Sequence, residues 1–154
     1  MSEKTNEDAL KRIEYLVSFQ ERCSKDMQER LVREGFSSEI AEEAVVRACS
    51  CGLINDARYA EILINSRLRS KKGKPGIERE LRNLGIDVES LTCWQDAFEK
   101  HDENSEVDRA LALLTAKPPR SSQPQRTAYA KLIGKGYSSS VASTASRLWW
   151  ETSQ

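Results

Sequence analysis

Eight basic side chains lie between residues 55 and 86, a stretch that holds only four acidic ones. They are Arg58, Arg67, Arg69, Lys71, Lys72, Lys74, Arg79 and Arg82. Lys and Arg at this density can neutralise the phosphates of a nucleic acid or the carboxylates of an acidic protein surface. Some of these cations stabilise a helix instead, because a cation in the last turn opposes the helix dipole by about 0.3 to 1 kcal/mol. We predict a partner-binding surface on the remainder.

A second basic stretch covers residues 109–154, with seven basic side chains and one acidic one. Its candidate partner-binding cations are Arg120, Arg126, Lys131 and Lys135. Between the two stretches, residues 87–108 hold one basic and eight acidic side chains, so the net charge of zero hides a strong pattern. Positive faces can then meet a partner while the overall field stays small. The alternative is that these side chains are ordinary solvated helix faces.

Catalytic and metal-binding patterns are absent from the sequence. The acidic residues are scattered, whereas a hydrolase or nuclease needs clustered carboxylates or a histidine-based pair. His101 is the only histidine, and no two cysteines are spaced as C-x-x-C, so a zinc site lacks its usual ligands. The cysteines are Cys23, Cys49, Cys51 and Cys93. We predict no enzyme activity, no metal, no cofactor and no small-molecule substrate.

The elements that position the first basic stretch are helices. Gly52 can take the left-handed conformation that ends a helix, and the next helix is predicted to start near Asp56. Its apolar positions recur at three- and four-residue steps, as a core-facing stripe requires. They are Tyr59, Ala60, Leu63, Ile64 and Leu68. Gly73 is predicted to break this helix, and Pro75 suits the first turn of a second one that Gly85 closes.

One spacing occurs three times along the chain: a leucine, three residues, a glycine and a hydrophobic residue. The three copies are Leu31, Gly35 and Phe36; Leu81, Gly85 and Ile86; and Leu132, Gly136 and Tyr137. The glycines are 50 and 51 residues apart, and a Ser or Asp that can cap a helix follows each pair. Each copy therefore predicts a helix, a glycine stop and a capped helix, in three helical modules in series.

These signals divide the chain into a polar tail at 1–8, a first repeat at 9–52, a second at 53–100, a polar linker at 101–106 and a third at 107–154. The other elements expected are Ser24 as an N-cap, one helix from Asp87 through Phe98, a helix over 107–117 and a loop over 118–125. Trp149 and Trp150 are adjacent, so one of them is expected to be partly exposed. No segment alternates with period two for long, which favours an all-α fold without a sheet.

The sequence has no apolar run near the roughly 20 residues that a membrane span needs. The first residues, MSEKTNEDAL, are too polar for a signal peptide. We therefore expect a cytoplasmic protein that does not act at a membrane.

The central residues resemble the RecX family, bacterial regulators of the RecA recombinase. The resemblance rests on Gly52-Leu53-Ile54-Asn55-Asp56, Tyr59-Ala60, Arg67, and the spacing Gly73, Ile77, Leu81, Gly85, Ile86. The flanking repeats agree, through Ser24, Leu31, Gly35 and Phe36 on one side and Leu132, Gly136, Tyr137 and Ser138 on the other. The third repeat departs from the family pattern in its Pro-rich loop and in the pair Trp149-Trp150.

The resemblance implies an elongated tandem array of three three-helix, helix-turn-helix-like repeats that lies in the groove of a RecA–DNA filament. It also implies inhibition of recombinase ATPase, strand exchange and co-protease activity, which modulates homologous recombination and the SOS response. It carries over no catalytic residue.

Two other functions fit the residues. Three-helix units with basic side chains could form a non-specific DNA-binding module, although the sequence pI of about 6.6 is near neutral. A helical adaptor for an unrelated protein is the third reading. A recombinase regulator should require the nucleoprotein filament, a DNA binder only DNA, and an adaptor neither.

Overall fold

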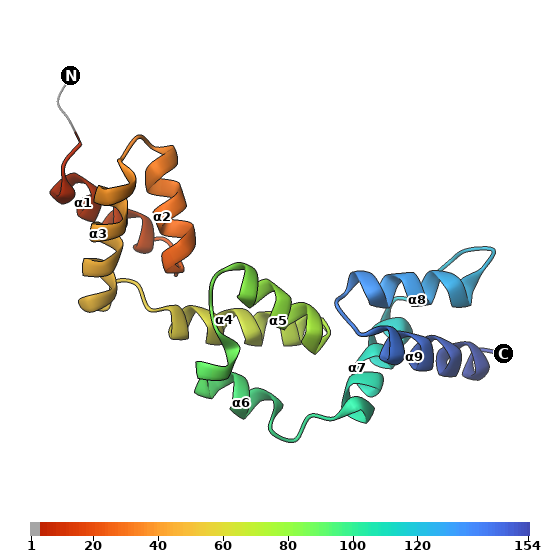
Figure 1. Ribbon diagram of the computed structural model, residues 1–154. Helices are drawn as coiled ribbons and strands as arrows, with labels where there is room; N and C mark the ends of the chain where they lie inside the picture. Colours follow the sequence, from red (N-terminus) through yellow and green to blue (C-terminus); the bar gives the residue numbers. More distant parts are fainter. Residues whose placement is uncertain (1–3) are drawn as a thin grey trace. The chain divides into compact units, whose positions relative to one another are not determined.

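The computed structural model describes residues 4–154, and all regular secondary structure in that range is helical. The α-helices are α1 (Asn6–Val17), α2 (Ser24–Arg33), α3 (Ser38–Ser50), α4 (Asp56–Arg69), α5 (Lys74–Asn83), α6 (Thr92–Phe98), α7 (Glu103–Ala116), α8 (Pro124–Gly134) and α9 (Ser139–Thr152), with a short 3₁₀ helix η1 (Val88–Ser90) before α6 (Figure 1). The prediction of an all-α helical-repeat fold is confirmed. None of the helices in this range is long and apolar enough to cross a membrane.

Contacts group the described residues into two compact units. The first contains the residues up to Glu61 together with Leu84–Ile86, and the second contains Ile62–Asn83 and Asp87–Gln154. The boundary falls inside α4, so the division into repeats at 9–52, 53–100 and 107–154 stays a prediction. Each unit is described by itself below.

In the first unit, α3 packs against both α1 and α2. Its core-facing positions carry small side chains, which let the helices approach closely. Ala41, Ala44 and Ala48 are buried, and they face larger buried side chains such as Ile13 and Leu31. The helical periodicity of these apolar positions explains why the segments form helices and which faces they bury.

The prediction of a polar tail over residues 1–8 is wrong in part. Asn6 begins α1, because Thr5 and Asp8 form a reciprocal capping box: the Asp8 amide donates to Thr5 Oγ1 at 3.2 Å, and the Thr5 amide donates to Asp8 Oδ2 at 3.0 Å. Residues 1–3 lie outside the described range. The expected N-cap is also wrong, since Cys23 occupies that position and Ser24 is the first residue of α2.

In the second unit, α9 packs against both α7 and α8. The buried side chains include Leu114 of α7, Leu132 of α8 and Trp149 of α9. Trp150 is half-buried, as expected for the second residue of an adjacent tryptophan pair. Ile77 and Leu81 of α5, one turn apart on one face of the helix, are fully buried.

Gly73 does not break the helix that precedes it, which corrects the prediction. α4 ends at Arg69, and Lys71 takes the left-handed conformation with φ of 62°. Gly73 instead permits a close backbone approach: its amide donates to the Lys135 carbonyl at 2.9 Å, and a Cβ added to it would lie 2.7 Å from the Gly136 carbonyl oxygen. Sequence periodicity alone does not distinguish these two uses of glycine.

The acidic segment also differs from expectation. Residues 87–98 form η1 and α6 rather than one helix, because Leu91 between them is extended at φ −97° and ψ 116°. The linker at 101–106 is shorter than predicted, since Asp102 accepts from the Ser105 amide at 2.9 Å and starts α7 at Glu103. The loop expected over 118–125 ends early because Pro124, with its fixed φ, opens α8.

Candidate functional site

The predicted cations divide into side chains engaged inside the fold and side chains open to solvent. Arg67 of α4 belongs to the first group. Its guanidinium forms a bidentate salt bridge with the carboxylate of Glu80 in α5, with Nε–Oε2 at 2.8 Å and Nη2–Oε1 at 2.5 Å. These hydrogen bonds lower the pKa of the Glu80 carboxyl. Arg67 therefore joins two helices, and its charge is largely compensated by Glu80.

Arg58 and Lys74 are also engaged. Arg58 of α4 pairs with Glu21, with Nε–Oε1 at 2.5 Å. The Lys74 ammonium at the start of α5 lies over two aromatic rings, 5.9 Å from the centroid of Trp94 and 5.1 Å from that of Phe98. A cation over a ring face is stabilised there, which reduces its value for an external ligand.

Lys131 of α8 donates from Nζ to the Lys117 carbonyl at 2.6 Å. Desolvation lowers its pKa, with further lowering by the neighbouring positive charges of Lys117 and Lys135. Lys72 and Lys135 are only half-exposed. These three cations are weaker candidates for a partner contact than fully exposed ones.

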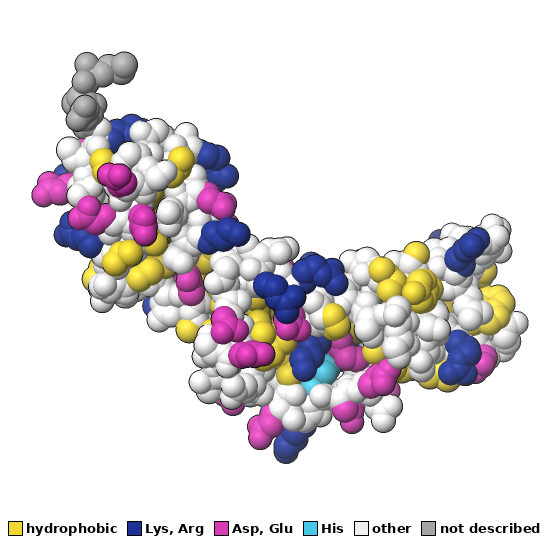
Figure 2. Space-filling model, viewed as in Figure 1, with side chains coloured by type: hydrophobic (Ala, Val, Ile, Leu, Met, Phe, Trp, Pro, Cys, Tyr) yellow, Lys and Arg dark blue, Asp and Glu magenta, His cyan; other side chains and the backbone are white. Residues whose placement is uncertain are grey.

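The remaining predicted cations are exposed. They are Arg69, Lys71, Arg79, Arg82, Arg120 and Arg126. Arg82 forms only a surface pair with Glu78 one turn away, at 2.9 Å, and its side chain is 70% exposed. Figure 2 shows Lys and Arg side chains gathered over α5 on the face drawn there. The exposed charges are available to a polyanionic surface.

Sequence reasoning missed the buried carboxylate of Glu106, which is 6% exposed. Its oxygens accept from the Lys74 amide, from Arg109 Nη1 and from the His101 ring Nε2, each at 2.7 Å. The sequence predicts that Glu106 lies in the polar linker at 101–106. The available signal was its position three residues before Arg109, the spacing at which helical side chains meet.

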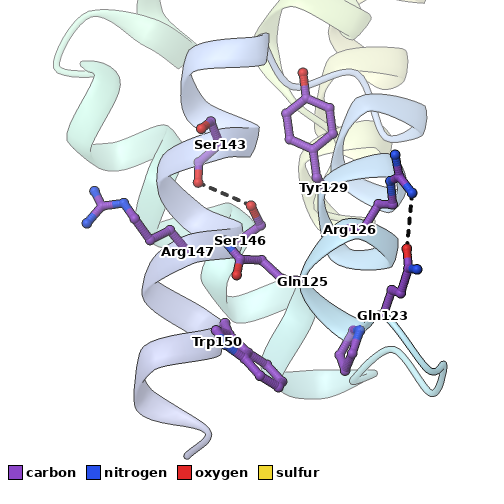
Figure 3. Close-up of a pocket in the computed structure, with 9 residues that line it drawn as sticks. Gln123, Gln125, Arg126, Tyr129, Ser143, Ser146, Arg147 and Trp150 are labelled. Carbon is purple, nitrogen blue, oxygen red and sulfur yellow. Dashed lines mark hydrogen bonds between the residues drawn. The ribbon is translucent and has the colours of Figure 1, made fainter.

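Sequence reasoning also missed a groove of about 640 Å³ between α8 and α9 (Figure 3). Its lining includes Arg126 and Tyr129 from α8 and Arg147 and Trp150 from α9. Each pair is spaced i, i+3, which places both members on one helix face. The predicted partner-binding set contains Arg126 for its charge alone and contains neither Arg147 nor Tyr129.

Residues 4–154 contain no group of three or more His, Cys, Asp or Glu side chains arranged to hold a metal ion. The described surfaces can bind anionic groups, because exposed guanidinium and ammonium groups pair with phosphates or carboxylates.

Comparison with known proteins finds similar sequences and a similar fold. Residues 55–90 match the family model described as the second three-helix domain of RecX. The chain is 33% identical over 79 residues to the regulatory protein RecX of Mycobacteroides abscessus, an alignment that covers 51% of this chain and 39% of that protein. It is 25% identical to the regulatory protein RecX of Stenotrophomonas maltophilia, over 86% of this chain and 81% of that one.

The fold agrees with a solved structure. The crystal structure of RecX from Lactobacillus salivarius superposes with a TM-score of 0.66 at 21% identity, over 94% of this chain and 96% of that chain. The domain match covers the central helices, and the sequence and structure matches extend over most of the chain. The resemblance of this chain to the RecX family is therefore confirmed by the domain match and by the sequence similarity, and the solved structure shows the same fold.

Proposed function

We propose that this chain is a non-enzymatic regulator that binds the RecA recombinase filament on DNA, lies in its groove and inhibits its activities. The inhibited activities are ATP hydrolysis, strand exchange and co-protease action, so the chain restrains homologous recombination and the SOS response. Similarity to the regulatory proteins of the RecX family supports the regulatory role. A cytoplasmic location follows from the proposed partner.

The observation that carries the proposal is the exposed basic surface at the end of α4 and on α5. Arg69, Lys71, Arg79 and Arg82 are exposed there, on a chain whose net charge is zero. A recombinase filament presents DNA phosphates and protein carboxylates together, so one partner can satisfy all four cations. Each close pair contributes about 0.5 to 1 kcal/mol at moderate salt.

A charge-reversal variant tests this surface. Arg69→Glu, Arg79→Glu and Arg82→Glu together should leave the helical content unchanged and weaken binding to the filament. Arg67 is left intact because its reversal would break the pair with Glu80 and confuse folding with binding.

The matched control is Lys11→Glu, Arg33→Glu and Arg47→Glu, which reverses three exposed cations in the first unit and changes the net charge equally. Equal filament binding by the two triple variants would refute the assignment of the surface.

A non-specific DNA-binding module is the second candidate, favoured by the same exposed cations. Binding to DNA alone and to the DNA-bound recombinase separates the two functions. The proposed regulator binds the filament much more tightly than the same DNA without recombinase, whereas a plain DNA-binding module binds both alike and loses affinity steeply with salt.

A further inference from the structure

The starting point is a carboxylate that caps α2 in the first unit. Asp56, the first residue of α4, accepts from the Ser24 amide at 2.7 Å and from the Ser24 hydroxyl at 2.6 Å. The first turn of a helix has unpaired amide groups and a positive dipole end, which a carboxylate satisfies. A side chain from the following repeat therefore caps the start of α2.

The same arrangement occurs in the second unit, 50 residues further along the chain. Glu106 of α7 accepts from the Lys74 amide at the start of α5 at 2.7 Å. Ser24 and Lys74 are 50 residues apart, and so are Asp56 and Glu106. Both contacts therefore join equivalent positions of successive repeats.

The third repeat has the equivalent position without the carboxylate. Leu81 and Leu132 are 51 residues apart, so Gln125 in the first turn of α8 corresponds to Lys74. The N-cap residue of α8, Gln123, makes no side-chain capping hydrogen bond. No residue in the described part of the chain supplies the carboxylate that Asp56 and Glu106 supply elsewhere.

The groove between α8 and α9 lies at this position. Gln125 lines it, between the two guanidinium-bearing residues Arg126 and Arg147 (Figure 3). Tyr129 and the half-buried Trp150 provide apolar surface, and none of the described lining residues is acidic. Arg126 Nη1 is held by Gln123 Oε1 at 3.1 Å, and Arg147 pairs loosely with Glu151 at 3.7 Å, so both charges can accept a stronger partner.

We propose that the α8–α9 groove binds a helix of a partner protein whose first turn carries a carboxylate. The partner helix would place its carboxylate at the start of α8, as α4 places Asp56 at the start of α2 and α7 places Glu106 at the start of α5. Its carboxylate meets the start of α8 and the two arginines, and its apolar side chains meet Tyr129 and Trp150. The inference rests on the proposed function in one respect: the partner is the protein component of the filament rather than its DNA.

A second copy of this chain is a poorer occupant. The residue of α1 that corresponds to Asp56 is Asn6, which is neutral and donates from Nδ2 to Glu43 Oε2 at 3.0 Å. Of the two carboxylates in the first turn of α1, that of Asp8 is engaged in the capping box with Thr5, and that of Glu7 lies one residue past the position that corresponds to Asp56. Neither carboxylate stands where Asp56 and Glu106 stand in their helices.

The test uses the full chain, labelled with ¹⁵N, and a synthetic peptide with the sequence of residues 102–116, which starts a helix and carries Glu106. At about 1 mM peptide, a concentration that reveals weak binding, we expect shifts of the Gln125 and Arg126 amide resonances and of the Trp150 indole N–H. The same peptide with Glu106→Gln should bind about tenfold more weakly, because one charge-assisted hydrogen bond is lost.

Two variants of the chain localise the site. Arg126→Glu with Arg147→Glu should abolish the shifts, whereas Arg120→Glu, an exposed cation that does not line the groove, should leave them unchanged. No shift at the named resonances, or equal binding of the Glu and Gln peptides, overturns the proposal. Stronger shifts with an oligothymidine than with the peptide assign the groove to DNA instead, and concentration-dependent dimerisation that the double variant removes assigns it to a second copy.

An inhibition assay with the recombinase filament separates this inference from the proposed function. The double variant should inhibit the recombinase less than wild type. If wild type itself fails to inhibit, the proposed function fails, while the peptide result still decides the chemistry of the groove.

Discussion

Replacing Gly76 with alanine tests the tight packing of α5 against the turn between α8 and α9. A Cβ at Gly76 would lie 2.6 Å from the Gly136 Cα, closer than real Cβ contacts come, and the obstacle is backbone rather than a flexible side chain. Relief of the clash separates the two backbones. That movement breaks the hydrogen bonds from the Gly76 amide to the Gly136 carbonyl and from the Gly73 amide to the Lys135 carbonyl, both 2.9 Å long.

Two hydrogen bonds at about 0.5 to 1.5 kcal/mol each, with some overpacking strain, give an expected loss of about 2 to 4 kcal/mol in the free energy of unfolding. Gly134→Ala is the matched control. A Cβ there has nothing within 4 Å, so it should be neutral or stabilise by up to about 1 kcal/mol through helix propensity. Urea denaturation followed by circular dichroism measures both variants. Equal stability of Gly76→Ala and wild type would refute the packing argument.

Three further predictions concern stability. Hydrogen bonds chiefly from Arg12 lower the pKa of Glu34 to about 2, so the stabilisation it provides is complete above its ordinary pKa of 4.5 and is lost as pH falls toward 2. Glu34→Gln should cost about 1 kcal/mol at pH 7 and flatten that acid dependence, and an unchanged pH profile would contradict the pairing. Gly85→Val should destabilise by about 1 to 2 kcal/mol in thermal unfolding, because Gly85 has φ of 75°, and an unchanged melting temperature would show that strain is absent. Tyr137→Phe should cost about 1 kcal/mol in urea denaturation, since its hydroxyl donates to the Lys71 carbonyl at 2.5 Å, and wild-type stability would mean that water replaces this bond.

The helices and their stops could be predicted because they depend on local chemistry. Gly35 and Gly85 follow the ends of α2 and α5 with positive φ, as the repeated spacing indicated. Local chemistry also explains the errors at helix starts. Thr5 and Asp102 are of residue types that cap helices, but their polar neighbours also fit a tail and a linker, so the sequence predicts helix starts that are too late at both places.

Contacts between repeats could not be predicted in the same way. A glycine at position 73 is compatible with a helix stop, which is what the sequence predicts. Only the folded chain shows that Gly73 instead lies against the backbone of Gly136. Glu106 is one of eight acidic residues in residues 87–108, and its spacing to Arg109 predicts an ion pair but not the burial that the contact with the Lys74 amide brings. For the same reason the sequence could not separate Arg67, which is paired with Glu80, from the exposed Arg69.

The most direct test of the central claim is the rate of single-stranded-DNA-dependent ATP hydrolysis by the cognate recombinase, measured as the purified chain is added. We predict that the rate falls with increasing chain and that the inhibition weakens as salt rises through the physiological range, where exposed charges are screened within about 8 to 10 Å. An unchanged rate at saturating amounts of folded chain would contradict the proposed function.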